Sequence, residues 1–240
     1  MSTVSLFRRA WRLATSATAR LPSQCAVCHA SSPQRLCMDC HTRYAAPRPR
    51  CVACATSVAG SVERCGACVL HPPVFAAAWA AVDYTYPWNT LVTRLKFHDG
   101  LDLLPALVPL MLAAHRPAPD DLLLPVPLSP QRLRERGFNQ AWELTRRLAR
   151  ATGTATDPHL LLRVRDTPHQ LSLKRPEREA AVRHAFAVDA LRRHEIEGRN
   201  ITLVDDVMTT MATANEISRV LLQAGAASVR VWCLARTPLQ

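Results

Sequence analysis

The chain has 240 residues, with 30 lysines and arginines against 19 acidic residues and a formal net charge of +11. This length suits one domain of ordinary size with a small appendage. No apolar run approaches the roughly 18 residues that predict a membrane span, which favours a soluble protein over a transmembrane one. The positive charge favours nucleic acid, acidic surfaces or phosphorylated small molecules as partners, without choosing among them.

The N-terminal segment, residues 1–23, contains no acidic residue and spaces its apolar side chains as a helix would. These side chains are Leu6, Phe7, Ala10, Trp11 and Ala14. The segment imitates a transit peptide but lacks the apolar core of a secretory signal. We therefore expect a short amphipathic helix that packs onto the residues that follow.

Eight of the nine cysteines form CxxC pairs within residues 24–72. The pairs are Cys25/Cys28, Cys37/Cys40, Cys51/Cys54 and Cys65/Cys68. One CxxC pair directs two thiolates at a tetrahedral position, and a second pair completes a four-cysteine zinc site. In a chain without an export signal, this pattern predicts metal ligands in a reducing cytoplasm rather than disulfides. We expect a double zinc-ribbon module with two structural zinc ions, and an iron–sulfur cluster is the minor alternative.

The spacing of the pairs leaves their assignment to the two sites open. Sequential pairing, first with second and third with fourth, gives the shortest loops and is preferred, while interleaved pairing is the alternative. His29, His41 and His71 lie nearby, but eight thiolates already suffice for two four-ligand sites, so we expect the histidines not to bind metal.

The main body, residues 73–240, alternates between strand-like and helix-like patterns. Strands are expected at 77–86, 121–128, 200–204 and 228–235, helices at 87–100, 101–115, 138–153 and 212–224, and a further short element at 184–188. The continuous apolar run at 121–128 is typical of a buried parallel strand. Cys233 falls within the last strand and is expected to be a small buried hydrophobic residue. The alternation predicts an α/β fold with a parallel sheet covered on both faces by helices.

The strand at 200–204 runs directly into Asp205 and Asp206 and then into the threonine-rich turn "MTTMAT". Ligands of open parallel sheets bind beyond the carboxyl ends of the strands, and a helix N-terminus there favours a phosphate. Two carboxylates beside a phosphate suit sugar hydroxyls or a magnesium ion, so a ribose 5-phosphate fits both halves of the turn. The alternative is that one side chain caps the helix and the second carboxylate is solvated.

The string "LVDDVMTTMAT" resembles the motif with which type I phosphoribosyltransferases bind PRPP, 5-phosphoribosyl 1-pyrophosphate. With the CxxC pairs, further strings resemble the ComF family of competence-associated proteins, from about Cys25 to the C-terminus. These strings are "LKF" (95–97), "PVPL" (125–128), "RERGFNQA" (134–141), "RVRDTPHQLSLKRPER" (163–178) and "HAFAV" (184–188). The resemblance implies a type I phosphoribosyltransferase-like sheet flanked by helices at 73–240, preceded by the double zinc ribbon at 24–72.

The resemblance also implies roles for the acids and the turn. Asp205 and Asp206 would contact the 2- and 3-hydroxyls of the ribose and are the candidate catalytic residues. The residues that would hold the 5-phosphate are Thr209, Thr210, Met211, Ala212 and Thr213.

Four residues outside the turn are candidate ligands of the diphosphate. Pro127 lies in the string that resembles the loop approaching pyrophosphate. Arg134 and Arg136 offer guanidinium groups that match phosphate oxygens, with a solvated charge cluster as the alternative. Lys96 is one of only two lysines in an arginine-rich chain, which hints that an ammonium group is required there.

The turn departs from the family pattern at Met211, where the family usually carries glycine. Glycine allows a positive φ and a close approach of the backbone to the phosphate. The departure makes ligand binding a firmer expectation than turnover. It also leads us to expect that Met211→Gly tightens phosphate binding.

Three functions are compatible with these features. The first is a magnesium-dependent phosphoribosyltransferase with an unidentified acceptor. The second is a non-catalytic single-stranded DNA-binding or adaptor protein of the uptake machinery, using the zinc module and an arginine-rich surface. The third is a metal-held interaction module, which leaves two adjacent aspartates without a use. We expect a ComF-type protein that binds PRPP with magnesium and acts in the cytoplasm in competence-related DNA uptake.

Overall fold

A computed structural model describes residues 23–97, 100–165 and 182–238 of the chain. Contacts divide it into two compact units, Met1–Ala46 and Pro47–Gln240. The amphipathic helix expected at 1–23 and most of the string at 163–178 lie outside the described residues. Among the residues that are described, no helix is long and apolar enough to cross a membrane.

The first unit is built around its four cysteines. A two-stranded antiparallel ladder pairs β1 (Ser23–Gln24) with β2 (Ser31–Ser32), and α2 (Met38–Tyr44) follows. Seven residues of helix and two-residue strands bury too little apolar surface to be stable alone, which is why small units of this kind depend on a metal.

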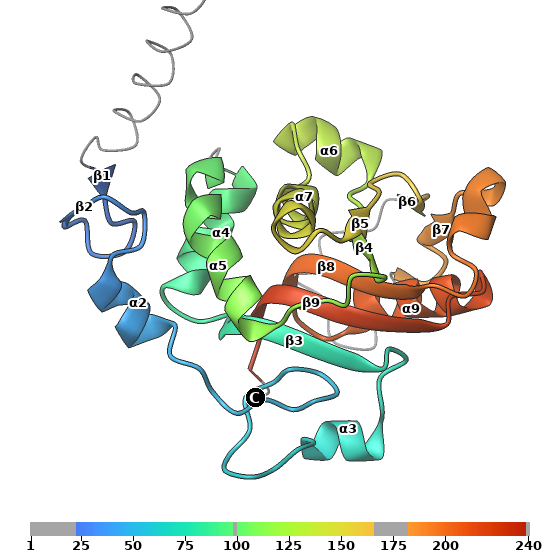
Figure 1. Ribbon diagram of the computed structural model, residues 1–240, viewed down its shortest axis with the longest axis horizontal. Helices are drawn as coiled ribbons and strands as arrows, with labels where there is room; N and C mark the ends of the chain where they lie inside the picture. Colours follow the sequence, from blue (N-terminus) through green and yellow to red (C-terminus); the bar gives the residue numbers. More distant parts are fainter. Residues whose placement is uncertain (1–22, 98–99, 166–181, 239–240) are drawn as a thin grey trace, which may run out of the picture. The chain divides into compact units, whose positions relative to one another are not determined.

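The second unit contains a five-stranded sheet in which every neighbouring pair is parallel (Figure 1). Its order is β3-β9-β8-β4-β5. The strands are β3 (Ala77–Asp83), β4 (Leu122–Pro125), β5 (Ala155–Thr156), β8 (Asn200–Met208) and β9 (Ser228–Arg236). The long strands β8 and β9 are buried almost throughout, as expected for central strands of a parallel sheet. The predicted class, a parallel sheet flanked by helices, is confirmed.

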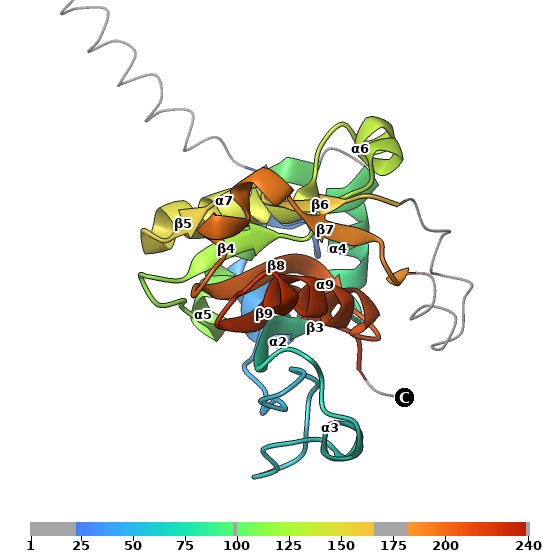
Figure 2. The same cartoon turned by 90° about the vertical axis from the view of Figure 1, so that its right-hand side faces the viewer.

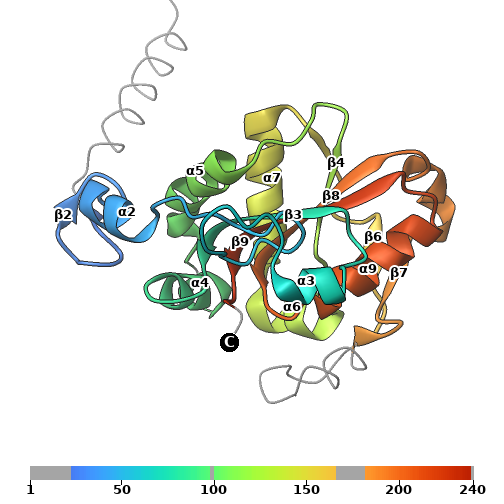
Figure 3. The same cartoon turned by 90° about the horizontal axis from the view of Figure 1, so that it is seen from below.

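Helices cover both faces of this sheet. One face packs against α4 (Trp88–Phe97), α5 (Leu104–Ala114) and α7 (Gln140–Thr152), and a short 3-10 turn η1 (Gly100–Leu103) precedes α5 (Figure 1). On the other face lie α9 (Ala212–Gln223) and the segment that carries α3 (Gly66–Leu70) (Figure 3). Alternate residues of β9 divide between these layers: Val231 and Cys233 join the α9 side, while Trp232 meets His115 at the end of α5.

The structure corrects three details of the predicted elements. Strand β8 continues four residues beyond 204, so Asp205 and Asp206 lie within the strand rather than at its tip. An additional helix, α6 (Pro130–Arg136), occupies the stretch between β4 and α7; Ser129 caps it, and Pro130 stands at its first position. The element at 184–188 forms β7 (Phe186–Val188), which pairs antiparallel with β6 (Leu161–Arg163) outside the main sheet (Figure 2).

The second group of four cysteines shares a hydrophobic core with the sheet. This core includes Cys51, Cys54, Cys65 and Cys68 together with residues of β3, β8, α9 and β9. The division into compact units after Ala46 lies between the two cysteine groups of the predicted 24–72 module. The physical reason is that the second cysteine segment buries its side chains against the strands.

Candidate functional site

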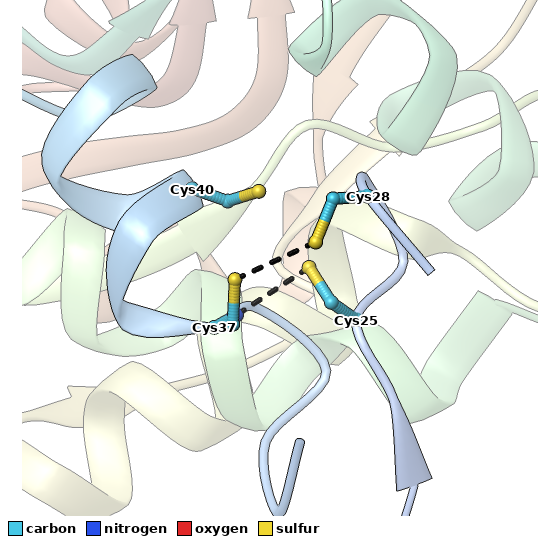
Figure 4. Close-up of side chains that lie close together, drawn as sticks. All are labelled: Cys25, Cys28, Cys37 and Cys40. Carbon is cyan, nitrogen blue, oxygen red and sulfur yellow. Dashed lines mark hydrogen bonds between the residues drawn. The ribbon is translucent and has the colours of Figure 1, made fainter. Parts of the chain in front are cut away.

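The first cysteine cluster brings four sulfur atoms together (Figure 4). Cys25, Cys28, Cys37 and Cys40 each offer a sulfur, and all four atoms lie within 4.8 Å of one another. The Cys28 and Cys37 sulfurs are 3.7 Å apart, and the backbone N–H of Cys37 donates to the Cys25 sulfur. A tetrahedron with Zn–S bonds of about 2.3 Å places its sulfurs about 3.8 Å apart. The cluster therefore fits a zinc ion.

The second cluster repeats this local structure with Cys51, Cys54, Cys65 and Cys68. The Cys54 and Cys65 sulfurs are 3.7 Å apart, and the N–H of Cys65 donates to the Cys51 sulfur. In each cluster the first CxxC pair is followed by a residue at positive φ, His29 or Ala55, and the second pair begins a short helix. Sequential pairing of the CxxC motifs is thus confirmed, and the nearby histidines are not part of either group of four.

The two clusters differ in their exposure. Cys28 is exposed in the first cluster, whereas all four cysteines of the second are buried. Although burial opposes the effect, backbone N–H donors lower the pKa of Cys25 to about 6 and that of Cys51 to about 7. Burial and the neighbouring sulfurs raise the pKa of Cys40 and Cys68, so one thiolate in each cluster is favoured before metal binds.

Asp205 and Asp206 are neighbours on β8, so their side chains leave opposite faces of the strand. Asp206 is buried and faces the α4 and α7 side, whereas Asp205 is half-buried. The backbone N–H of Asp206 donates to Oδ1 of Asp205 at 2.8 Å. The two carboxylates are therefore adjacent but differently surrounded.

Asp206 is held by residues from two helices. The Lys96 ammonium on α4 lies 2.6 Å from Oδ2 of Asp206, and the Gln140 amide on α7 donates to Oδ1 at 3.2 Å. The sequence hinted that an ammonium group is required at position 96, and the structure shows the Lys96 ammonium in contact with Asp206. Gln140 was not among the predicted site residues, although it lies in the string "RGFNQ" on which the family resemblance partly rested.

Arg136 joins the same network at the end of α6. Its guanidinium donates to Oε1 of Gln140 at 3.0 Å and stacks over the Phe97 ring at 4.7 Å from the centroid. The rest of the string fixes this placement: Gly137 ends α6 at φ 77°, and the Asn139 side chain accepts from the first amides of α7. The string at 136–140 therefore contains the residue that ends α6, the residue that caps α7, and two residues of the charged network, Arg136 and Gln140.

The charges in this network shift one another's pKa values. Burial and the neighbouring Asp206 raise the pKa of Asp205 well above its usual range. Burial alone would also raise the pKa of Asp206, but Lys96 outweighs it and the pKa of Asp206 is lowered. Likewise, burial opposes the charge on Lys96, and Asp206 outweighs it, so the pKa of Lys96 is raised. The favoured state is a charged Lys96–Asp206 pair beside an Asp205 that tends to hold its proton.

The threonine-rich turn connects β8 to α9. Thr209 is exposed, Thr210 and Thr213 are half-buried, and Met211 and Ala212 are buried. Met211 occupies the position before α9 without a side-chain cap, which leaves the first amides of the helix without that capping partner. The turn thus has the exposed hydroxyls and helix N-terminus expected of an anion site.

Met211 has a φ of 68°, the left-handed conformation that the usual glycine adopts freely. Its side chain is 6% exposed and belongs to the core shared by α9 and the second cysteine cluster. The chain therefore adopts a positive φ at this position without glycine. Because the side chain points into the core, it offers no reason for a weakened phosphate site, and the expected tightening by Met211→Gly loses its basis.

We now expect Met211→Gly to lower stability without a large change in ligand affinity. Relief of the left-handed strain contributes about 1–2 kcal/mol, while emptying a buried methionine site costs about 2–5 kcal/mol. The net effect is a lower midpoint of thermal unfolding with an affinity for PRPP within about threefold of wild type, about 0.7 kcal/mol. Thermal unfolding and calorimetric titration measure the two quantities, and a variant that gains stability would show that the strain exceeds the packing.

Two predicted site residues, Pro127 and Arg134, lie outside this network. Pro127 is buried in the segment after β4, next to Val126, whose carbonyl accepts from the Asn139 side chain. Arg134 is exposed on α6. Among the described residues, Arg134 makes none of the contacts that link Lys96, Arg136, Gln140 and Asp206.

A cavity of about 1170 Å³ lies between α9 and the hairpin strand β7. It includes Met211 and Ala212 from the turn, but Asp206, Lys96 and Arg136 do not line it. The cavity therefore lies beside the network around Asp206. The candidate site is the network itself, where Lys96, Gln140 and Arg136 converge on Asp206.

These features define an α/β protein with a parallel sheet, an acidic strand and threonine turn at the sheet's carboxyl edge, and two four-cysteine sites. The sequence is 38% identical over 174 residues to the DNA utilization protein YhgH of Salmonella typhi, covering 69% of this chain and 74% of that protein. It is 34% identical over 160 residues to competence protein F of Haemophilus influenzae, covering 64% and 69%. The chain belongs to the ComF family.

A shorter match joins the chain to competence protein ComFC of Bacillus subtilis, 38% identical over 117 residues, covering 48% of this chain and 45% of that protein. No family model matches the sequence. Among solved structures, the glutamine PRPP amidotransferase of B. subtilis complexed with ADP and GMP aligns with a TM-score of 0.40 and 23% identity. That alignment covers 59% of this chain and spans only 30% of the amidotransferase chain.

Proposed function

We propose that this protein binds PRPP, together with magnesium, at the carboxyl edge of β8. The observation that carries the proposal is the convergence of two cations on Asp206 near the threonine turn, Lys96 directly and Arg136 through Gln140. The family resemblance assigns the ribose hydroxyls to Asp205 and Asp206 and the 5-phosphate to residues 209–213, and Lys96 and Arg136 would lie towards the diphosphate. Carboxylate oxygens are also suitable ligands for magnesium, which would accompany the diphosphate and neutralise part of its charge.

The charge balance of the site removes an apparent conflict in this proposal. Two carboxylates beside a polyanionic ligand would repel it if both were ionised and unpaired. Here Lys96 already pairs with Asp206, and burial and the neighbouring Asp206 raise the pKa of Asp205, so that this carboxyl is protonated more readily than an ordinary one. With Arg136 in the same network, two cations offset the charge of the two carboxyl groups, so the site can accept a phosphorylated sugar.

A transferase reaction is the chemistry that bound PRPP would allow. It would break the bond between C1 of the ribose and the pyrophosphate oxygen and form a bond from C1 to an acceptor nucleophile, which loses its proton. In this chemistry a protein mainly positions the reactants and stabilises the negative charge of the leaving group. In this proposal Arg136 and Lys96 would stabilise that charge.

We further propose that both clusters hold zinc, that the residues from about 73 onward form the phosphoribosyltransferase-like domain, and that the protein acts in the cytoplasm. Closed four-thiolate sites leave zinc no open position for water, so the metal would shape the protein rather than react. The fit of the sulfur distances to a zinc tetrahedron supports this role.

The neighbouring arginines Arg134 and Arg136 provide a matched test of the proposed site. Both lie on α6, but only Arg136 contacts the network. Losing a charge-assisted contact to phosphate costs about 1.5–3 kcal/mol, so Arg136→Ala should weaken binding of magnesium–PRPP about tenfold or more. Arg134→Ala should stay within about twofold of wild type. Calorimetric titration measures both, and equal losses would indicate general charge attraction rather than a site.

The second candidate function is handling of single-stranded DNA, without catalysis, in the uptake machinery. It is favoured by the relatives named for DNA utilization and competence, by the net charge of +11 and by a first cysteine unit that is compact by itself. Such binding would weaken steeply with salt, because each neutralised phosphate releases counterions. An affinity for an oligonucleotide that does not change with salt would exclude it.

A further inference from the structure

We infer that Arg236 is a positioning residue that connects the second cysteine cluster to the threonine turn, so that metal bound by the cluster determines how firmly the turn is held. Arg236 is the last residue of β9 and is 1% exposed. The connection itself is independent of any ligand, while its effect on PRPP rests on the proposed function. Neither the family resemblance nor the sequence pattern pointed to this residue.

The guanidinium of Arg236 reaches two separate segments with different nitrogens. Its Nε donates to the carbonyl of Cys54 at 2.8 Å. Its Nη1 donates to the carbonyl of Met208 at 3.0 Å and also to the carbonyl of Thr209. Cys54 belongs to the second cluster, and Met208 and Thr209 are the end of β8 and the start of the turn. A single rigid fork therefore bridges the metal site and the turn.

The contacts with the two carbonyls also orient amides of the turn. Because a peptide group is planar and trans, the N–H that follows a carbonyl points in the opposite direction. With the Met208 and Thr209 carbonyls directed at Arg236, the N–H groups of Thr209 and Thr210 point away from the guanidinium. Positive charge behind a carbonyl and free N–H groups in front are the arrangement that suits an anion.

Electrostatics gives a reason for the metal in this arrangement. Burying a guanidinium is costly unless opposite charge compensates it, and the hydrogen-bond acceptors of Arg236 are neutral carbonyls. A zinc ion with four thiolates carries a net charge of 2 − 4 = −2. The second cluster, when loaded, would add negative charge near the buried cation, in addition to the carboxylate of Asp83, which lies opposite Arg236 in the ladder and is paired with Arg50. When the metal leaves and protons take its place on the four thiolates, that charge is lost and the segment that carries the Cys54 carbonyl loses its metal crosslink, so the hold on the turn weakens.

Arg50 supplies a matched control. Like Arg236, it fastens the second cysteine segment to the sheet, since its Nη1 donates to the carbonyl of Ala55 at 3.0 Å and to Asp83 at 2.8 Å. Asp83 ends β3 and lies opposite Arg236 in the parallel ladder. Arg50 therefore holds the cluster without reaching the turn.

The first test uses hydrogen exchange and needs no ligand. In Arg236→Lys, a point charge replaces the fork and cannot bridge both segments, so amides at 208–213 should exchange about tenfold faster or more, and zinc should leave the second cluster faster. Arg50→Lys should speed zinc release and leave exchange at 208–213 unchanged. Unchanged exchange of the turn in a folded Arg236→Lys protein would overturn the inference.

The second test uses the wild-type protein, so it does not depend on a variant that folds. With cadmium-113 in both clusters, the resonance of the second cluster should shift as magnesium–PRPP is added, while that of the first stays in place, because coupling between sites is reciprocal. Calorimetric saturation with no shift, or with both resonances shifted, would overturn the inference. Absence of calorimetric binding counts against the proposed function instead, and the exchange experiment then decides the connection.

Discussion

Replacing Cys54 with serine is expected to unfold the second unit at a much lower temperature, whereas the corresponding replacement of Cys28 should leave that unit nearly unchanged. Both substitutions remove one thiolate from a four-cysteine site and should cost one zinc ion per chain. The difference lies in what each site supports. Cys54 is 1% exposed within the core shared with the sheet, while Cys28 is exposed in the separate first unit.

The size of the effect follows from the coupling of metal binding to folding. Structural zinc contributes about 10–16 kcal/mol of apparent binding free energy at neutral pH, which is comparable to the whole stability of a domain, about 5–15 kcal/mol. Tryptophan fluorescence during heating reports mainly on the second unit, which contains four of the five tryptophans, Trp79, Trp88, Trp142 and Trp232. A chelator assay counts the zinc.

Cys233→Ala is the control for loss of a buried thiol. Cys233 is buried in β9 but is not one of the metal-site cysteines, so both zinc ions should remain. Equal unfolding temperatures for Cys28→Ser and Cys54→Ser would contradict the claim that the two sites serve different units.

The second large effect is expected at the ion pair between half-buried Lys96 and buried Asp206. Lys96→Met should destabilise the protein by about 3–5 kcal/mol, because it leaves the buried Asp206 carboxylate without its cation. Adding Asp206→Asn to that variant should restore much of the loss, since no unpaired charge remains. By contrast, Arg94→Met breaks an exposed pair with Asp102 and should cost at most about 1 kcal/mol.

The advantage of wild type over Lys96→Met should also depend on pH. The folded-state pKa of Asp206 is lowered, so the stability it contributes is present above its unfolded pKa and is lost as pH falls through its folded pKa. Chemical unfolding across the acid range measures this difference. An advantage that grows on acidification, or a double variant no more stable than Lys96→Met, would show that the pair does not act as described.

The sequence predicted the features that local chemistry specifies. The CxxC pairs gave both four-cysteine groups, since a short spacing can satisfy only one geometry, and the apolar run at 121–128 correctly indicated a buried strand. The predicted end of β8 was wrong. Asp205 and Asp206 are poor strand formers, but pairing with β9 keeps them in the ladder.

The features that were missed depend on contacts between distant residues. Gln140 meets Asp206 across 66 positions, and Arg236 reaches Cys54 across 182. An arginine at the end of an apolar strand reads as an ordinary solvent-facing residue, so no pattern marks it as buried. The compact boundary after Ala46 was likewise hidden, because both cysteine groups look alike in sequence and only packing separates them.

We propose that Asp205, Asp206 and the turn at 209–213 form a PRPP site. Its most direct test is calorimetric titration of PRPP with magnesium into the zinc-loaded protein, beside the Asp205→Ala/Asp206→Ala variant and the more conservative Asp205→Asn. We predict saturable binding by the wild type, weaker binding by Asp205→Asn and none by the double variant. No binding by the wild-type protein, or equal binding by all three, would contradict the claim.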